Sequence, residues 1–153
     1  MMQVEQVYDV DLLRPLMELW KQETNGDLQV TTDVNYTALN VASMMQDPSA
    51  RIFGLVRDDR LIGFLGCRLF RSPTGPELMA QEHYFYVAPE HRGKGTFKLL
   101  VAARDWAKAR GASGLLLSAS YLASDLHDKV CKLYAHMGAK PFETTMLLNL
   151  SEV

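Results

Sequence analysis

The chain has 153 residues, of which 48% are hydrophobic and 22% are charged, so it is long enough to form one domain with a buried core. This composition is that of an ordinary globular protein, and no apolar run approaches the ~20 residues that a membrane-spanning helix needs. A formal net charge of −2 argues against general binding to nucleic acid or to anionic membranes.

The first third of the chain predicts one strand followed by two helices. Residues 3–8 read as a short strand, and apolar residues recur at helical spacing from about residue 9 to residue 22. A second helix is expected from about residue 33 to residue 45, and the Asp47-Pro48 pair stops it. The segment between the two helices, "ETNGDLQVTTD", is expected to be a loop.

The middle of the chain predicts a hairpin, a long strand and a long helix. Residues 51–70 contain two apolar runs about an Asp58-Asp59 turn, as a hairpin requires. After a loop, residues 78–87 read as a long strand that leads into a glycine-bearing turn. The helix after this turn is expected to run to Arg110, with Trp106 on its apolar face and Gly111 as its C-terminal cap.

The last third predicts further strands around one more helix. Residues 114–120 are expected to form a fully buried strand. Ser124 is placed to cap a helix that ends at Gly138, and residues 139–150 are expected to supply a last pair of strands. This order of elements predicts a single domain, residues 1–153, with one mixed sheet and helices on both faces, in the α/β or α+β class.

The turn between the long strand and the long helix has the features of an anion-binding site. Its backbone N–H groups are expected to face outward at a helix N-terminus, where the helix dipole favours negative charge. Two glycines let the backbone approach a ligand closely, and two basic side chains add positive charge. The residues expected to hold the anion are Arg92, Gly93, Lys94, Gly95 and Thr96.

Two well-known phosphate-binding patterns do not fit this turn. A P-loop needs Gly-x-x-x-x-Gly-Lys followed directly by Ser or Thr, but here Gly95 separates Lys94 from Thr96. In addition, no glycine stands five residues before Gly93. The dinucleotide pattern Gly-x-Gly-x-x-Gly wants a third glycine where this chain has Lys98, and it is expected in a first βαβ unit.

A third pattern fits. The stretch "YVAPEHRGKGTFKLL" resembles the coenzyme-A loop of the GCN5-related N-acetyltransferase (GNAT) superfamily, Arg-x-x-Gly-x-Gly/Ala between a strand and a helix, and the order of elements matches nearly end to end. The resemblance implies the acyl-CoA N-acyltransferase fold, with a mostly antiparallel sheet of about seven strands. It implies acetyl-CoA as the co-substrate, with its pyrophosphate in the turn, and no metal. The residues implied to contact the cofactor are Phe85, Tyr86, Val87, Arg92, Gly93, Lys94, Gly95, Thr96, Phe97, Lys98 and His127.

Phe97 departs from the family pattern, which has glycine or alanine at this position. Side chains in the first turn of a helix need not point at an anion that is bound there. We therefore expect the Phe97 ring to turn toward the core and to leave the N–H groups of the turn accessible.

The stretch "HDKVCKLYAHMGAKPF" resembles a later family motif, Asn-x-x-Ala-x-x-(Leu/Phe)-Tyr-x-x-x-Gly-Phe. By this resemblance Tyr134 lies near the cofactor sulfur and is a candidate general acid, because a phenol can protonate the thiolate that leaves a thioester. The alternative is a tyrosine that only fills the edge of the core. The matching residues are Leu133, Tyr134 and Gly138, and the departures are His127, Val130 and Ala139.

The reaction also needs a base, because an alkylammonium acceptor has a pKa of ~10.4 and must lose a proton before it attacks. Histidine suits proton transfer at neutral pH, and family members with a histidine base carry it four residues before the valine that matches Val87, which points to His83. Other members use a glutamate on this strand, so Glu82 is the alternative if a bulge shifts the alternation. Strict alternation predicts two faces: Gln81, His83, Phe85 and Val87 on one, and Glu82, Tyr84 and Tyr86 on the other.

The same resemblance gives the backbone of residues 85–87 a further role, as a strand edge that hydrogen-bonds the pantetheine arm. A backbone N–H near Val87 would also stabilise the oxyanion of the tetrahedral intermediate. Ser118 and Ser120, at the end of the next strand, border the cleft where the two strands should separate. Their hydroxyl groups either touch the acceptor or simply end the strand.

These observations predict an N-acetyltransferase that moves an acetyl group from acetyl-CoA to a primary amine by direct transfer in a ternary complex. The acceptor stays open between a small-molecule amine and a protein amine. Carboxylates in the segments expected to border the acceptor give a slight preference for a cationic amine. They are Glu23, Asp27, Asp33 and Glu143.

Two alternatives remain. Phe97, His127 and Ala139 motivate a non-catalytic CoA-binding or regulatory module with the same fold. The basic stretch from Arg92 to Arg110 motivates a nucleic-acid binder, but neither nucleic acid nor membrane is our expected partner. The oligomeric state is open, a homodimer included.

The two cysteines, Cys67 and Cys131, form no disulfide or zinc pattern, so both are expected to be buried thiols in a reducing compartment. Neither is placed as a nucleophile. The first residues, "MMQVEQVYDVD", lack the basic stretch and the apolar segment of a signal peptide, so we expect a cytoplasmic protein.

Overall fold

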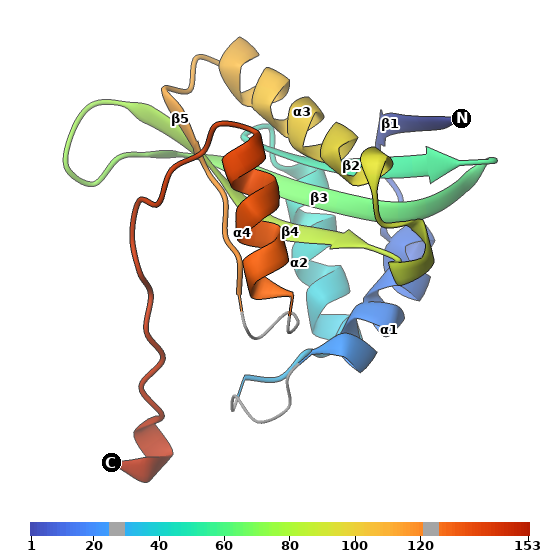
Figure 1. Cartoon of the computed structure of the whole chain (residues 1–153), viewed down its shortest axis with the longest axis horizontal. Helices are drawn as coiled ribbons and strands as arrows, with labels where there is room; N and C mark the ends of the chain where they lie inside the picture. The colour runs from blue at the N-terminus through green and yellow to red at the C-terminus, as the bar shows by residue number, and fades with distance from the viewer. Residues whose placement is uncertain (25–29, 121–125) are drawn as a thin grey trace.

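Figure 1 shows the computed structural model of the chain, which describes residues 1–24, 30–120 and 126–153 except the side chain of Lys94. Its described strands form one sheet, in the order β1-β2-β3-β4-β5. They are β1 (Met2–Gln6), β2 (Ala50–Arg57), β3 (Arg60–Arg71), β4 (Leu78–Val87) and β5 (Gly114–Leu116). The described α-helices are α1 (Arg14–Glu23), α2 (Val34–Gln46), α3 (Lys94–Ala109) and α4 (His127–His136).

The sheet is mixed, as predicted. Strands β1 to β4 pair antiparallel to one another, whereas β5 runs parallel to β4. The parallel pairing joins only residues 79–81 of β4 to residues 114–116 of β5. Beyond these residues the two strands are not paired, and this separation opens the site described below.

Helices cover both faces of the sheet (Figure 1). Helices α1 and α2 pack on one face, around Met17, Val41 and Phe64, which are almost fully buried. Helices α3 and α4 pack on the other face, where Leu99 and Leu100 are completely buried. Burial of this many large apolar side chains on both faces is the main stabilising contribution to the fold.

Trp106 belongs to the core under α3 and packs edge-on against Phe53. The prediction that it lies on the apolar face of its helix is confirmed.

The turn residues act as the sequence predicts. Asp58 and Asp59 both have positive φ, 51° and 60°, which is the backbone of the two-residue turn that joins antiparallel strands. Gly111 has a φ of 86° directly after α3, the left-handed conformation that ends a helix. Gly138 does the same for α4, with a φ of 100°.

Three expectations about the C-terminal third need correction or lie outside the described residues. Across the described residues the sheet has five strands rather than about seven, because residues 139–149 form no strand and only a short 3-10 turn, Leu150–Glu152, follows them. The strand expected over residues 114–120 is shorter, Gly114–Leu116, and half-buried rather than fully buried, because no described strand covers its second edge. Ser124, the expected helix cap, lies outside the described residues.

The cysteine expectation is half right. Cys67 is completely buried in the core, whereas Cys131 is exposed because it lies on the outer side of α4. Across the part of the chain that the structure describes, every helix falls short of the length and apolar character needed to cross a lipid bilayer.

Candidate active site

A cleft of about 570 Å³ lies where β4 and β5 separate. One wall is the second half of β4, and the opposite wall is formed by residues 118–120 and by α4. The turn at Gly93 closes one end, at the N-terminus of α3. Of the residues predicted to bind the cofactor, those that line the cleft are Phe85, Tyr86, Val87, Arg92, Gly93, Thr96 and His127.

A β-bulge in β4 decides which side chain enters the cleft. Tyr84 pairs with Gly66 and Glu82 pairs with Cys67, so β4 has one more residue than β3 at this point, and that residue is His83. The predicted strict alternation is therefore wrong here, because the extra residue shifts Glu82 to the side that faces the cleft and α4.

Glu82 is buried in this cleft, with 7% of its surface exposed. The hydroxyl group of Tyr134 donates to its carboxylate at 3.2 Å and also lies 2.7 Å from the main-chain carbonyl oxygen of Ser118. Tyr134 comes from α4 and Glu82 from β4, so the pair bridges the cleft behind the ring of Phe85, which stacks on Tyr134.

Burial sets the proton affinities of this pair. Removal of the Glu82 carboxylate from water raises its pKa to about 7, against the opposing effect of the hydrogen bonds from Tyr134 and Ser118. Burial and the adjacent negative charge of Glu82 raise the pKa of Tyr134 well above its ordinary value. A carboxylate with a pKa near neutrality beside a protonated phenol is suited to accept one proton and donate another.

His83, the first candidate from the sequence, has a different environment. The residue is exposed overall, and the partial burial of its ring together with the nearby Arg68 lowers its pKa, which favours the neutral imidazole. His83 borders the cleft and also a smaller hollow of about 250 Å³ on the other side of β4. This hollow is lined mostly by polar residues: Asn40, Ser43, Met44, Arg68, His83 and Tyr84.

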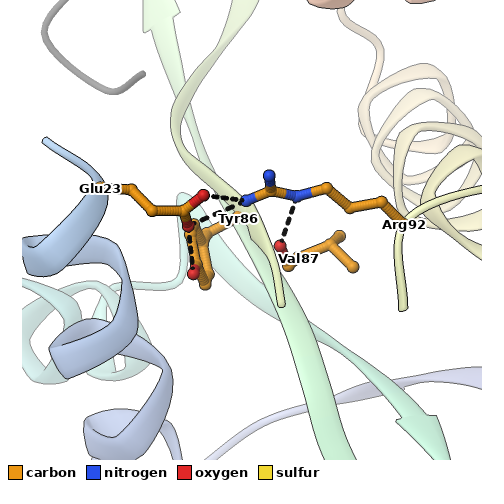
Figure 2. Close-up of polar contacts among 4 residues, drawn as sticks. All are labelled: Glu23, Tyr86, Val87 and Arg92. Atoms are coloured by element: carbon orange, nitrogen blue, oxygen red, sulfur yellow. Dashed lines mark hydrogen bonds and ion pairs between the residues drawn. The ribbon is translucent and has the colours of Figure 1, made fainter. Parts of the chain in front are cut away.

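Figure 2 shows the contacts of Arg92, the first residue of the turn that is predicted to bind an anion. The Arg92 guanidinium donates from Nη2 to both carboxylate oxygens of Glu23, at 3.0 Å each, and from Nε to the main-chain oxygen of Val87 at 2.9 Å. The Tyr86 hydroxyl donates to the same Glu23 carboxylate at 2.5 Å, and the guanidinium lies over the Tyr86 ring. The positive charge of Arg92, expected to face the anion, is therefore paired with the C-terminal end of α1.

The amides of the turn are only partly free. The N–H of Gly93 donates to the Thr96 hydroxyl at 3.2 Å, and the N–H of Thr96 donates to the Gly93 carbonyl at 3.1 Å. The N–H of Arg92 makes a long bond, 3.4 Å, to Pro89. The expectation that every amide of the turn faces outward is thus wrong for these groups, because the turn satisfies them locally, and an anion that used them would replace the Thr96 hydroxyl.

The two glycines of the turn have different roles. Gly93 has a φ of 148°, which L side chains rarely adopt, and a Cβ there would meet nothing within 4 Å, so this backbone is open to a ligand. A Cβ at Gly95 would lie 2.0 Å from the sulfur of Met2, so this glycine lets α3 approach the sheet. Gly95 thus contributes packing rather than a surface of the cleft.

Phe97 and Lys98 lie away from the cleft lining. The Phe97 ring is half-buried against the core under α3 and meets the ring of His136 edge-on, at 5.8 Å between centroids. The expectation that it turns inward agrees with this position. Lys98 reaches the main-chain oxygen of Met2 at 2.9 Å instead of the turn. The side chain of Lys94, the other predicted cation of the turn, lies outside the described part of the chain.

Main-chain N–H groups of β4 point toward the cleft. Ala88 donates its N–H to Ile62 on β3, whereas the Val87 carbonyl points the other way, to Arg92. Because N–H and C=O of one strand residue point to the same side, the Val87 N–H lies on the cleft edge, as does that of Phe85 two residues earlier.

Some residues of the site were not expected from the sequence, and some expected carboxylates serve other purposes. Trp20, at the end of α1, lines the cleft and stacks on Tyr86, and the only signal in the sequence was its place in the apolar stripe of that helix. Glu23 is paired with Arg92, and Asp33 caps α2 by accepting the N–H of Tyr36. Asp27 lies outside the described residues. Among residues 1–24, 30–120 and 126–153, no group of three or more His, Cys, Asp and Glu is arranged to hold a metal ion.

Comparison with known proteins identifies the family of the chain and structures with a similar fold. The sequence profile of the acetyltransferase (GNAT) family matches residues 13–139. No protein with a curated description matches the sequence of the chain.

The fold is similar to those of several solved structures. A ribosomal-protein-alanine N-acetyltransferase from Brucella melitensis biovar Abortus 2308 is 23% identical, with a TM-score of 0.73 over 98% of this chain and 99% of that one. A transcriptional regulator from Bacillus halodurans C-125 is 14% identical, with a TM-score of 0.78 over 98% and 100%. An aminoglycoside acetyltransferase from an uncultured soil sample is 15% identical, with a TM-score of 0.72 over 98% and 99%.

Proposed function

Because this chain belongs to the GNAT acetyltransferase family, we propose that it moves an acetyl group from acetyl-CoA to a primary amine by direct transfer in a ternary complex. In this proposal acetyl-CoA lies in the cleft between β4 and β5, with its diphosphate at Gly93 and its pantetheine arm along the edge of β4 at Phe85 and Val87. The observation that carries the proposal is the buried Glu82–Tyr134 pair inside this cleft.

Glu82 is the base in this mechanism. The amine nitrogen attacks the thioester carbonyl carbon and forms a C–N bond, and its excess proton passes to the Glu82 carboxylate, directly or through water. A carboxylate with a pKa of about 7 is largely ionised at slightly alkaline pH, yet basic enough to hold the proton it receives. His83, exposed and with a lowered pKa, is the alternative base and would act from the side of the smaller hollow.

Tyr134 is the acid. As the C–S bond breaks, the phenol donates its proton to the leaving thiolate, and the 3.2 Å hydrogen bond lets protonated Glu82 return a proton to Tyr134. The charge of Glu82 is one of the causes that raise the pKa of Tyr134. When Glu82 takes up the proton of the amine, that cause disappears, so the phenol becomes a stronger acid in the step that needs one.

The backbone and α1 complete the site. The Val87 N–H, on the open edge of β4, is placed to stabilise negative charge on the thioester oxygen. The Arg92–Glu23 ion pair holds the turn, the edge of β4 and the end of α1 in one arrangement. Orientation of this kind lowers the barrier because the reacting groups need not be ordered during the reaction.

A panel of amines tests the proposal. The full chain is incubated with acetyl-CoA and each amine in turn, and both free thiol and acetylated product are measured. One structure with a similar fold is a ribosomal-protein-alanine N-acetyltransferase, and another is an aminoglycoside acetyltransferase. The panel therefore includes peptide N-termini and aminoglycosides. The panel also includes amines that carry a carboxylate, because Arg68 lines the smaller, polar hollow beside β4. Thiol release that requires both the amine and Glu82 supports the proposal.

The alternative, a non-catalytic CoA-binding module, predicts acetyl-CoA binding without thiol release with any amine. Phe97 was one reason to consider it, and its ring lies against His136 rather than in the cleft. The raised pKa of the buried Glu82 carboxyl beside Tyr134 favours proton transfer over binding alone. We therefore place this alternative second.

A further inference from the structure

The smaller hollow of about 250 Å³ lies on the face of the sheet that α1 and α2 cover, opposite to the face that carries α3 and α4 (Figure 1). Three elements meet there, and each contributes polar side chains. Apart from His83 as the alternative base, the proposed reaction gives these side chains no role. They are Asn40 and Ser43 from α2, Arg68 from β3, and His83 and Tyr84 from β4.

The polar groups of this hollow are not occupied by the protein itself. Within the described part of the chain, the side chains that make no hydrogen bond are those of Asn40, Ser43, His83 and Tyr84. The Arg68 Nε lies 3.5 Å from a carboxylate oxygen of Asp47 without a hydrogen bond to it. The other oxygen of Asp47 accepts both the N–H and the hydroxyl group of Ser49. Convergent polar groups that lack partners are typical of a site for a polar ligand.

Arg68 gives the hollow its charge. Burial, and then the charge of Arg68, lower the pKa of His83, so the guanidinium rather than the imidazole carries the positive charge here. A guanidinium is a planar fork of donors that matches the two oxygens of a carboxylate. The Asn40 amide and the Ser43 hydroxyl can donate to the same group. One cation that Asp47 partly neutralises suits a ligand with a single negative charge.

The hollow also communicates with the place of the proposed reaction. His83 borders both the hollow and the cleft, and β4 pairs with β5 only as far as residue 81, so the edge of β4 is open from Glu82 onward. A short molecule held at Arg68 can therefore extend past His83 to Glu82. Asn40 and Ser43 are exposed, which leaves an entrance on the α2 side while acetyl-CoA fills the cleft from the α4 side.

The size of the hollow limits the ligand. Sites for drug-sized ligands have volumes of about 300–1,000 Å³, so a hollow of about 250 Å³ fits a smaller molecule. This favours an acceptor smaller than an aminoglycoside.

On the basis of the proposed function, we propose that the acceptor is a small amino acid, whose carboxylate binds Arg68 and whose amine reaches Glu82. The amine nitrogen forms a C–N bond with the acetyl carbon, and the C–S bond of the thioester breaks. The proton of the amine passes to Glu82, and the thiolate takes a proton from Tyr134, so the products are an N-acetyl amino acid and free CoA. Arg68 determines specificity in this step and takes no part in the proton transfers.

The test compares amino acids with their own carboxamides as acceptors. Glycine, β-alanine, γ-aminobutyrate and larger α-amino acids are each paired with the amide that lacks the negative charge. We expect the kcat/KM of the best acceptor to exceed that of its carboxamide by about 10-fold or more. In Arg68→Gln this ratio should fall to about one. In Arg60→Gln, an exposed position at the other end of β3, it should be unchanged. A ratio measured within one variant does not depend on how much of that variant is folded.

A second measurement does not require turnover. Calorimetric titration of the full chain with the same amino acids, in the presence of CoA, should show binding that Arg68→Gln abolishes and Arg60→Gln retains. If no amine releases thiol but this Arg68-dependent binding persists, the hollow is still an amino-acid site and only the proposed transfer fails.

Three results would overturn the inference. One is a best acceptor without a carboxylate, and another is a preference for the acid over its amide that survives in Arg68→Gln. The third is the absence of amino-acid binding at about 10 mM, a concentration above the usual range of KM values.

Discussion

Glu23 and Arg92, 69 positions apart in the sequence, form an ion pair in which the guanidinium contacts both carboxylate oxygens and joins the end of α1 to the turn before α3 (Figure 2). Both side chains are about one-quarter to one-third exposed, so solvent weakens the pair, but the carboxylate also accepts the Tyr86 hydroxyl. The pair therefore connects three elements that line the cleft.

The first prediction concerns this pair. Glu23→Gln should lower the free energy of unfolding by about 1 kcal/mol, because it removes one charge from a hydrogen-bonded ion pair that is partly screened. Thermal unfolding measures the change. Glu18→Gln, an exposed position on the same helix, is the matched control and should change nothing. Equal unfolding temperatures for the two variants would show that the contact contributes no stability.

The second prediction concerns the acid. Tyr134→Phe should lower kcat about 100-fold or more, because the leaving thiolate loses its proton donor. The dissociation constant for acetyl-CoA should stay nearly unchanged, since the ring and its stacking on Phe85 remain. Tyr8→Phe, at an exposed tyrosine, controls for loss of a phenol elsewhere. Full turnover in Tyr134→Phe would remove this residue from the mechanism.

The third prediction concerns the base. Because Glu82 must be ionised to accept a proton, kcat/KM should rise with pH through an inflection near the Glu82 pKa of about 7. In Glu82→Gln this inflection should disappear and the rate should fall by about 100-fold. His83→Gln should retain both the inflection and most of the rate. The reverse result, with the inflection lost in His83→Gln only, would make His83 the base.

The fourth prediction follows from the same raised pKa and concerns stability. A carboxyl group whose pKa is higher in the folded state than in the unfolded state binds its proton more tightly in the folded state. The free energy of unfolding therefore falls as the pH rises from about 4.5 to about 7, and this loss of stability persists at higher pH. Glu82→Gln removes this cost. At pH 8 its free energy of unfolding should exceed that of the parent by on the order of 1–3 kcal/mol, and its unfolding temperature should be higher. At pH 4.5 it should show no such gain. An equal difference at both pH values would mean that the effect has another origin.

Much of the fold was predictable because it rests on local signals. The hairpin turn at Asp58-Asp59 and the helix ends at Gly111 and Gly138 follow from residues that tolerate positive φ. The boundaries of β4 also agree with the prediction, because a long apolar run with turn residues at both ends has few alternatives. The family resemblance placed the glycine-bearing turn at the N-terminus of α3, where the structure has it, and its binding of an anion stays a prediction.

The details of the site were less predictable because they depend on contacts between distant segments. The bulge at His83 is set by pairing with Gly66 and Cys67, so strand alternation alone could not choose between Glu82 and His83. Likewise, no local pattern indicates that Arg92 is held by Glu23. The last two strands were predicted over residues 139–150, but strand formation requires a partner edge, and residues 139–149 lie on none within the described chain.

The fifth prediction concerns the turn. Gly93→Ala should weaken acetyl-CoA binding about 10-fold or more, because alanine disfavours the φ of 148° and the backbone that faces the ligand must shift. Gly111→Ala is the matched control, since that glycine also has positive φ and open surroundings but lies at the other end of α3. Both variants should lose similar stability. Equal loss of binding in both would show that the effect is not specific to the turn.

The central claim is that the cleft between β4 and β5 holds acetyl-CoA, with its diphosphate at the Gly93 turn. Calorimetric titration of the full chain with acetyl-CoA tests this most directly. We predict binding of one molecule per chain, with an affinity that falls sharply in Gly93→Ala and stays unchanged in Gly111→Ala. The absence of binding at high micromolar ligand would contradict the account.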